Sequence, residues 1–196
     1  MKLFLLLNML AFPFCSKGFY LDRETEKQRC FGDCIQALKE SNDDFLPWHH
    51  RFLGYLCQQP QGLDLIKQIA NQKTLWCTKR DHIHILLLNI ARGFYNYSND
   101  LEHEQMHTVL DIFLTAAAHH GYPNFVNTVH PNGDSILRAS IEHNNHGYAQ
   151  VALAHKARLD IKWYSIADKQ FYNPLEFAHK KFGSSSKMVA VLQQHG

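Results

Sequence analysis

Apolar residues recur at helical spacing along most of the chain. Between residues 22 and 41 they fall three or four positions apart, and similar stripes predict helices over about 46–57 and around 65–70. The stretch from about Asp81 to Tyr95 is apolar on most faces, which predicts a centrally placed helix. No segment alternates apolar and polar residues between hairpin turns, as half-buried strands would. The pattern therefore predicts an all-α chain.

A long helix is predicted next along the chain. Ser98, Asn99 and Asp100 offer an N-cap, and Gly121 offers an end. The positions expected to face the core are Met106, Val109, Leu110, Phe113, Leu114 and Ala117.

The last two dozen residues, Asn173 to Gly196, predict two short antiparallel helices around a glycine turn. Asn173 can cap the first helix, and Pro174 stands at its first position, where the missing N–H costs nothing. Gly183 supplies the turn, and the serines at 184–186 can cap the second helix.

Residues 133–161 carry a weaker copy of this pattern, with Ser135 where Asn173 stands. NPLEFAHKKFG and this copy resemble ankyrin repeats, whose stacked helix pairs are joined by a hairpin-like finger. The two units are offset by 38 residues, against about 33 in the family, and the extra residues lie in DIKWYSIADKQF, the place of the finger. LTAAAHHGYPNFV, at 114–126, resembles a further helix pair, but Ser135 stands only nine positions after Val126, which is too close for an ankyrin connection.

The resemblance implies helical hairpins stacked as a short solenoid, ankyrin-like at the C-terminal end. Residues 111–196 would form the repeats, and residues 19–110 a helical N-terminal region. The alternative is two helical hairpins in an irregular bundle.

The resemblance also implies a function, which is binding another protein without catalysis. The partner would be held by the finger tips and the first-helix face. Trp163, Tyr164, Phe171 and Tyr172 in the long finger are the expected anchors, since aromatic residues dominate binding hot spots. Alternatively, these rings fill the space between neighbouring units.

The first eighteen residues form a separate segment. Lys2 precedes an apolar run too short to span a bilayer, Pro13 breaks it, and Ser16 and Gly18 are small. This layout predicts a signal peptide over residues 1–18, cleaved near Phe19, and export to the periplasm or the medium. The alternative is a retained, buried first helix in a cytosolic protein.

Four cysteines follow that segment: Cys30, Cys34, Cys57 and Cys77. An even number in an exported protein predicts two disulfides. Because Cys30 and Cys34 share a helical face, each is expected to pair with Cys57 or Cys77. Four reduced, buried thiols in a cytosolic core are the alternative.

His103-Glu104-Gln105-Met106-His107 reads HExxH and resembles the motif of zinc metallopeptidases. On a helix, His103 and His107 could bind Zn²⁺ from one face while Glu104 polarises a metal-bound water. The HxxGxxH extension is absent, and Glu142 and His143 are only positional guesses for a third ligand. The alternative function is therefore a zinc hydrolase, with Zn²⁺ as its cofactor. A protein-binding module is expected to have no cofactor.

The charge of the chain argues against one class of partner, nucleic acid. The net charge is +2 with scattered lysines and arginines, which argues against nucleic acid because phosphate binding needs a basic patch. No apolar run reaches the length of a membrane span. The sequence thus predicts a protein-binding module, acting as a small secreted adaptor or a bacterial effector-like factor.

Overall fold

The computed structural model describes residues 53, 57, 61–93, 100–165 and 167–196, with the side chains of 100–104 left out. The chain divides into two compact units, Met1–Asp44 and Phe45–Gly196, and every described residue belongs to the second. The predicted signal peptide, Cys30 and Cys34 lie outside the described residues.

The described part of the second unit is mostly helical, as the apolar spacing predicted. From residue 61 onward the helices are α4 (Gly62–Ala70), α5 (Lys73–Thr78), α6 (Arg80–Arg92) and α7 (Asp100–His119). A 3₁₀ turn, η2 (Phe125–Asn127), precedes α8 (Ile136–Glu142) and α9 (His146–Ala154). A hairpin of β1 (Trp163–Ser165) and β2 (Gln170–Tyr172) leads into α10 (Pro174–Phe182) and α11 (Lys187–Gln193).

The predicted caps of the C-terminal helices are confirmed. Ser135 Oγ accepts from the Arg138 amide over 3.3 Å at the start of α8. Asn173 and Glu176 form a reciprocal capping box with two 2.8 Å hydrogen bonds, and Pro174 is the first residue of α10. Ser186 caps α11. These side chains satisfy backbone N–H groups that a helix start leaves without partners.

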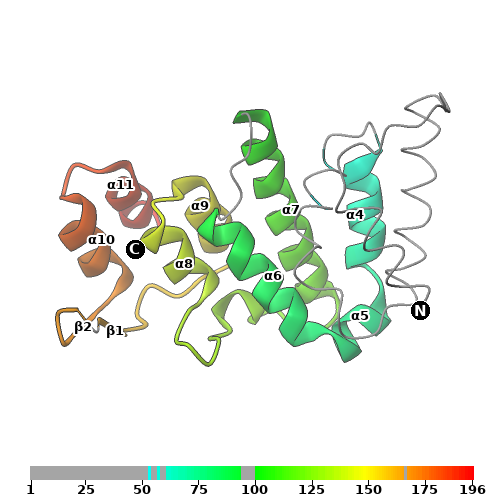
Figure 1. Cartoon of the computed structure of the whole chain (residues 1–196), viewed down its shortest axis with the longest axis horizontal. Helices are drawn as coiled ribbons and strands as arrows, with labels where there is room; N and C mark the ends of the chain where they lie inside the picture. The colour runs from blue at the N-terminus through cyan, green and yellow to red at the C-terminus, as the bar shows by residue number, and fades with distance from the viewer. Residues whose placement is uncertain (1–52, 54–56, 58–60, 94–99, 166) are drawn as a thin grey trace, which may run out of the picture. The chain divides into compact units, whose positions relative to one another are not determined.

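Helices far apart in sequence pack in two rows (Figure 1). In one row α6 contacts α8, and α8 contacts α10; in the other, α7 contacts α9, and α9 contacts α11. The helices of each consecutive pair, α6–α7, α8–α9 and α10–α11, also contact each other, and α4 packs on α7. The middle pair, α8–α9, thus contacts both the pair before it and the pair after it.

The core follows the predicted apolar faces. All six inward positions of α7 are buried, and so are Ala178 of α10 and Val189, Val191 and Leu192 of α11. Ala178 has no exposed surface, which fits a small residue where paired helices approach closely.

Two expectations differ from the structure. The finger segment forms a short antiparallel hairpin, as a hairpin-like finger implies, although the apolar pattern predicts no strand, because three-residue strands are too short to show alternation. Residues 114–126 do not form a helix pair: α7 continues to His119, and η2 follows Gly121, whose φ is +90°. Residues 114–119 are therefore the end of α7, which contacts α6, and the remainder leads into η2.

Cys57 is buried and Cys77 is exposed, and both are free thiols. Burial raises the pKa of the Cys57 thiol to about 12, so it stays protonated. Neither Cys57 nor Cys77 forms the predicted disulfide in this structure. The partners expected for them, Cys30 and Cys34, lie outside the described residues. Among the helices the structure describes, none combines the length and apolar character needed to cross a membrane.

Candidate functional site

The hairpin that occupies the place of the finger has two unlike faces. Trp163 pairs with Tyr172, Tyr164 with Phe171, and Ser165 with Gln170. Since side chains alternate along a strand, the Trp163–Tyr172 pair and the Tyr164–Phe171 pair point to opposite sides.

The inner face of the hairpin packs on the helices. Trp163 is 7% exposed, and its ring meets the edge of Phe177 on α10 at 6.2 Å between centroids. The guanidinium of Arg138 on α8 lies 6.0 Å from the Trp163 ring. Tyr172 also contacts Phe177, at 6.3 Å. Trp163 therefore fills the space between α8 and α10, as the alternative interpretation expected, and it offers little surface to a partner.

Lys180 of α10 makes polar contacts with the hairpin. Its ammonium forms an ion pair with Asp168 and donates a 2.8 Å hydrogen bond to the Tyr172 hydroxyl. Asp168 also accepts a 2.8 Å hydrogen bond from Ser165 across the turn. The hydrogen bond from Lys180, then that from Ser165, lowers the pKa of the Asp168 carboxyl. Asp168 is therefore a carboxylate near neutral pH, and its charge is already matched by Lys180.

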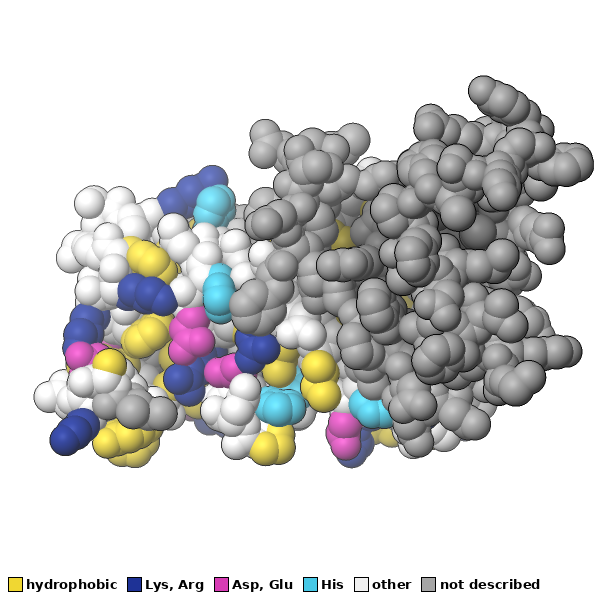
Figure 2. All heavy atoms as spheres, in the orientation of Figure 1, with side chains coloured by type: hydrophobic (Ala, Val, Ile, Leu, Met, Phe, Trp, Pro, Cys, Tyr) yellow, Lys and Arg dark blue, Asp and Glu magenta, His cyan; other side chains and the backbone are white. Residues whose placement is uncertain are grey.

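The outer face of the hairpin is apolar and exposed. Tyr164 is 45% exposed and Phe171 is 64% exposed, with their rings 5.1 Å apart and tilted by 56°. Figure 2 shows apolar side chains at the place of the hairpin, with a lysine or arginine beside them. Such a ring pair removes little of its own surface from water, so it is available for a contact.

A second exposed apolar side chain lies on the preceding connection. Val129, in the loop 128–134 that leads into α8, is 51% exposed. Within the described ranges, Val129, Tyr164 and Phe171 are the large hydrophobic residues that are exposed. Both connections enter a helix of the same row, α8 or α10, at its N-terminus, and both lie along the same edge in Figure 1. The exposed apolar surface thus gathers at one edge of the two rows.

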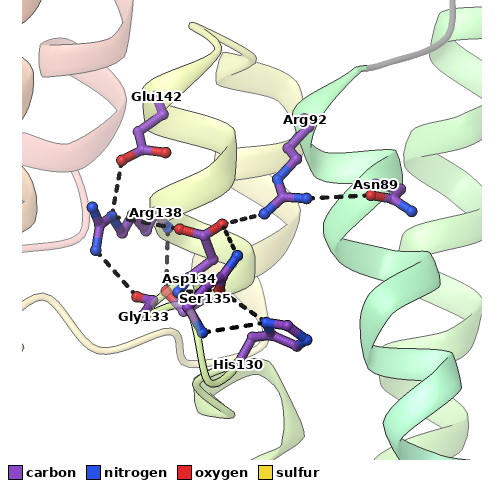
Figure 3. A network of polar contacts seen from close by, with 9 residues as sticks. Asn89, Arg92, His130, Gly133, Asp134, Ser135, Arg138 and Glu142 are labelled. Carbon is purple, nitrogen blue, oxygen red and sulfur yellow. Dashed lines mark hydrogen bonds and ion pairs between the residues drawn. The ribbon is translucent and has the colours of Figure 1, made fainter.

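A network of polar contacts fixes the loop 128–134 (Figure 3). Arg92 at the end of α6 forms an ion pair with Asp134, and its Nη1 donates to Asn89 over 3.3 Å. Asp134 also accepts from Asn132 over 3.0 Å. Arg138 of α8 donates to Glu142 over 2.9 Å and to the Gly133 carbonyl over 3.2 Å. These part-buried charges join α6, the loop and α8, and Arg138 carries the connection on to Trp163.

His84 lies beneath the same loop. It is 4% exposed, and its ring meets Phe125 at 5.7 Å and His130 at 6.3 Å. Its Nε2 is buried without a hydrogen-bond partner. Burial, and then the nearby His130, lowers the pKa of His84 to about 4. The imidazole is therefore neutral at pH 7, because the cost of burying its charged form outweighs the attraction of Asp81.

The HExxH motif lies in the first two turns of α7. The side chains of His103 and Glu104 are outside the described residues. The His107 ring packs against α9, meeting the edge of the Tyr148 ring at 4.3 Å. Of the two suggested third ligands, Glu142 is bonded to Arg138, and burial lowers the pKa of His143. Among the described side chains there is no group of three or more that could hold a metal ion.

Several site residues were not singled out from sequence. Val129 stands alone in a loop, and the Lys180–Asp168 and Arg92–Asp134 contacts join residues far apart in the chain. For the Lys180–Asp168 pair the only signal was charge: Asp168 lies within the predicted finger, and Lys180 lies in the helix predicted after it. Neither a protein-family model, nor a curated protein, nor a solved structure matches this chain.

Proposed function

We propose that this chain is a protein-binding module, built as a short stack of helical hairpins that is ankyrin-like at its C-terminal end. The partner is another protein, held at the edge formed by the loop 128–134 and the hairpin. An exported chain of this kind would act as a small adaptor or effector-like factor.

The helix contacts support the stack. α6, α8 and α10 follow one another in one row, and α7, α9 and α11 in the other. In such an arrangement each pair contacts only its neighbours, and the connections between pairs project from one edge. The capped start of α10 and the capped start of α8 stand at equivalent places in this repeat.

The observation that carries the proposal is the position of the exposed apolar side chains. In the described part of the chain they gather on two connections, while apolar residues elsewhere are largely buried. The Tyr164–Phe171 pair stands on a hairpin fixed from behind by Trp163 and Lys180. A rigid aromatic pair loses little conformational entropy on binding, which favours a role as an anchor.

Site-specific photocrosslinking tests the proposal. A benzophenone amino acid replaces Phe171, and the full chain is exposed to extracts and secreted material of its source. We expect a distinct crosslinked protein, identified by mass spectrometry, that then binds the unmodified chain when both are purified. The matched control carries the benzophenone at Gln193, an exposed position on α11.

The same partner should lose affinity for the Tyr164→Ser, Phe171→Ser double variant, provided that its thermal unfolding curve is unchanged. Equal crosslinking at positions 171 and 193, or a partner that binds the double variant as tightly as the original chain, would contradict the assignment of this surface.

A further inference from the structure

Two exposed lysines, Lys162 and Lys169, lie close in sequence to the exposed aromatic pair of the hairpin. Lys162 directly precedes β1 and lies two residues before Tyr164 in sequence. Lys169, in the turn, comes two residues before Phe171 and has a left-handed backbone with φ of 54°. Both lysines are exposed. Each ring of the aromatic pair thus has an exposed lysine two residues before it in sequence.

The acidic side chains near this face are already engaged. Asp168 is paired with Lys180, and Asp160 is paired with Arg158 over 2.6 Å. Glu176 accepts from the Asn173 amide in the capping box. Among the described residues, no ion pair involves Lys162 or Lys169, so their charge is available to a partner.

The C-terminal part of the chain is also basic as a whole. Residues 155–196 contain seven lysines and arginines against three acidic residues, whereas the full chain has 20 against 18. The remainder of the chain is therefore slightly acidic. A field of this sign favours the approach of acidic partners.

We propose that the hairpin binds an acidic peptide segment, with an apolar side chain of that segment against Tyr164 and Phe171 and its carboxylates beside Lys162 and Lys169. This inference rests on the proposed protein-binding function and specifies the chemistry of the partner. Two free lysines suit a short acidic segment. Nucleic-acid binding, with roughly six to ten phosphate contacts, would need a longer basic stripe.

Peptide selection tests the proposal. A random dodecapeptide library displayed on phage is selected on the immobilised full chain, and individual peptides are then synthesised and titrated. We expect selected peptides to combine aspartate or glutamate with a large apolar residue. Their affinity should disappear in the Tyr164→Ser, Phe171→Ser variant. It should fall roughly tenfold in the Lys162→Gln, Lys169→Gln variant, as two exposed charge contacts would produce.

The matched control is Lys73→Gln, Lys187→Gln, which removes the same charge at exposed positions on α5 and α11. It should bind the peptides with unchanged affinity. A Lys162→Glu, Lys169→Glu variant should instead prefer a peptide whose acidic residues are replaced by lysine. This exchange of preference separates direct charge recognition from damage to the hairpin.

The remaining outcomes overturn the inference in distinguishable ways. Peptides that need Tyr164 and Phe171 but carry no acidic excess contradict the charge assignment and leave the protein-binding surface in place. A selection without any peptide that depends on the hairpin contradicts both proposals. If fluorescent oligo(dT) binds the chain more tightly than the selected peptides do, and that binding is lost in the Lys162→Gln, Lys169→Gln variant, the surface recognises nucleic acid and the proposal is wrong.

Discussion

The imidazole of His107 on α7 lies directly over Gly147 at the start of α9. A Cβ added to Gly147 would lie 2.6 Å from His107 Nε2 and would overlap Cε1. The same ring meets Tyr148 edge-on at 4.3 Å. The second histidine of the HExxH motif thus serves the packing between α7 and α9, and the glycine is required by the close approach of the ring.

Replacing Gly147 by alanine should destabilise the fold. Alanine favours a helix over glycine by about 1 kcal/mol, but the overlap with His107 should cost about 1–3 kcal/mol. We expect a net loss of free energy of unfolding, measured by urea denaturation. In a His107→Ala background the overlap disappears, and the same Gly147→Ala change should become stabilising. A loss of equal size in both backgrounds would contradict the contact.

Acidification should destabilise the protein through His84. Its folded-state pKa is about 4, against an ordinary value of 6.5. The unfolded chain therefore takes up this proton first as the pH falls. Above about pH 6.5, His84 is neutral in both the folded and the unfolded chain, and the protein keeps its full free energy of unfolding. Between about pH 6.5 and pH 4 this free energy falls progressively, and the total loss at pH 4 is about 3 kcal/mol.

The His84→Leu variant tests this prediction. It removes the titrating group while keeping an apolar side chain beneath the loop 128–134. We expect its unfolding midpoint to vary less between pH 7 and pH 4 than that of the original chain. His195→Leu, at the exposed C-terminus, is the matched control and should retain the original slope. Parallel curves for all three proteins would refute the role of His84.

Breaking the Arg92–Asp134 pair should loosen the edge that carries Val129. Asp134→Asn leaves the part-buried Arg92 and Arg138 with less negative charge nearby. We expect a loss of roughly 1–3 kcal/mol in the free energy of unfolding. Amide hydrogen exchange in the loop 128–134 should also become faster.

Asp160→Asn provides the comparison, because it breaks the exposed Arg158–Asp160 pair. That variant should leave the unfolding midpoint unchanged. If Asp134→Asn and Asp160→Asn behave alike, the network in Figure 3 does not stabilise the contact between α6 and α8.

Metal analysis decides between the protein-binding proposal and the zinc hydrolase alternative. The chain is purified without a histidine tag, incubated with Zn²⁺ and dialysed. We expect less than one bound zinc per chain, because a zinc site needs a third protein ligand beside two histidines. One zinc per chain, lost in the His103→Ala variant, would instead favour a hydrolase and call for peptidase assays.

Local signals in the sequence were sufficient for the helices and their ends. Asn173, Pro174 and Gly183 determine where α10 begins and ends, because capping and left-handed backbone depend on neighbouring residues alone. The apolar stripe of α7 likewise identified its buried face. These features needed no knowledge of what each helix packs against.

The tertiary structure decided the pairing of helices and the character of the candidate site. Trp163 and Tyr164 are adjacent aromatic residues in sequence, yet one is buried against α10 and the other is exposed. Their difference follows from which face of the hairpin meets Phe177, and that contact joins residues from separate elements. Likewise, Arg92 and Asp134 lie 42 positions apart, and no local pattern distinguishes a paired charge from a solvated one. Caps and periodicity act over a few residues, whereas burial and ion pairing depend on segments that only the folded chain brings together.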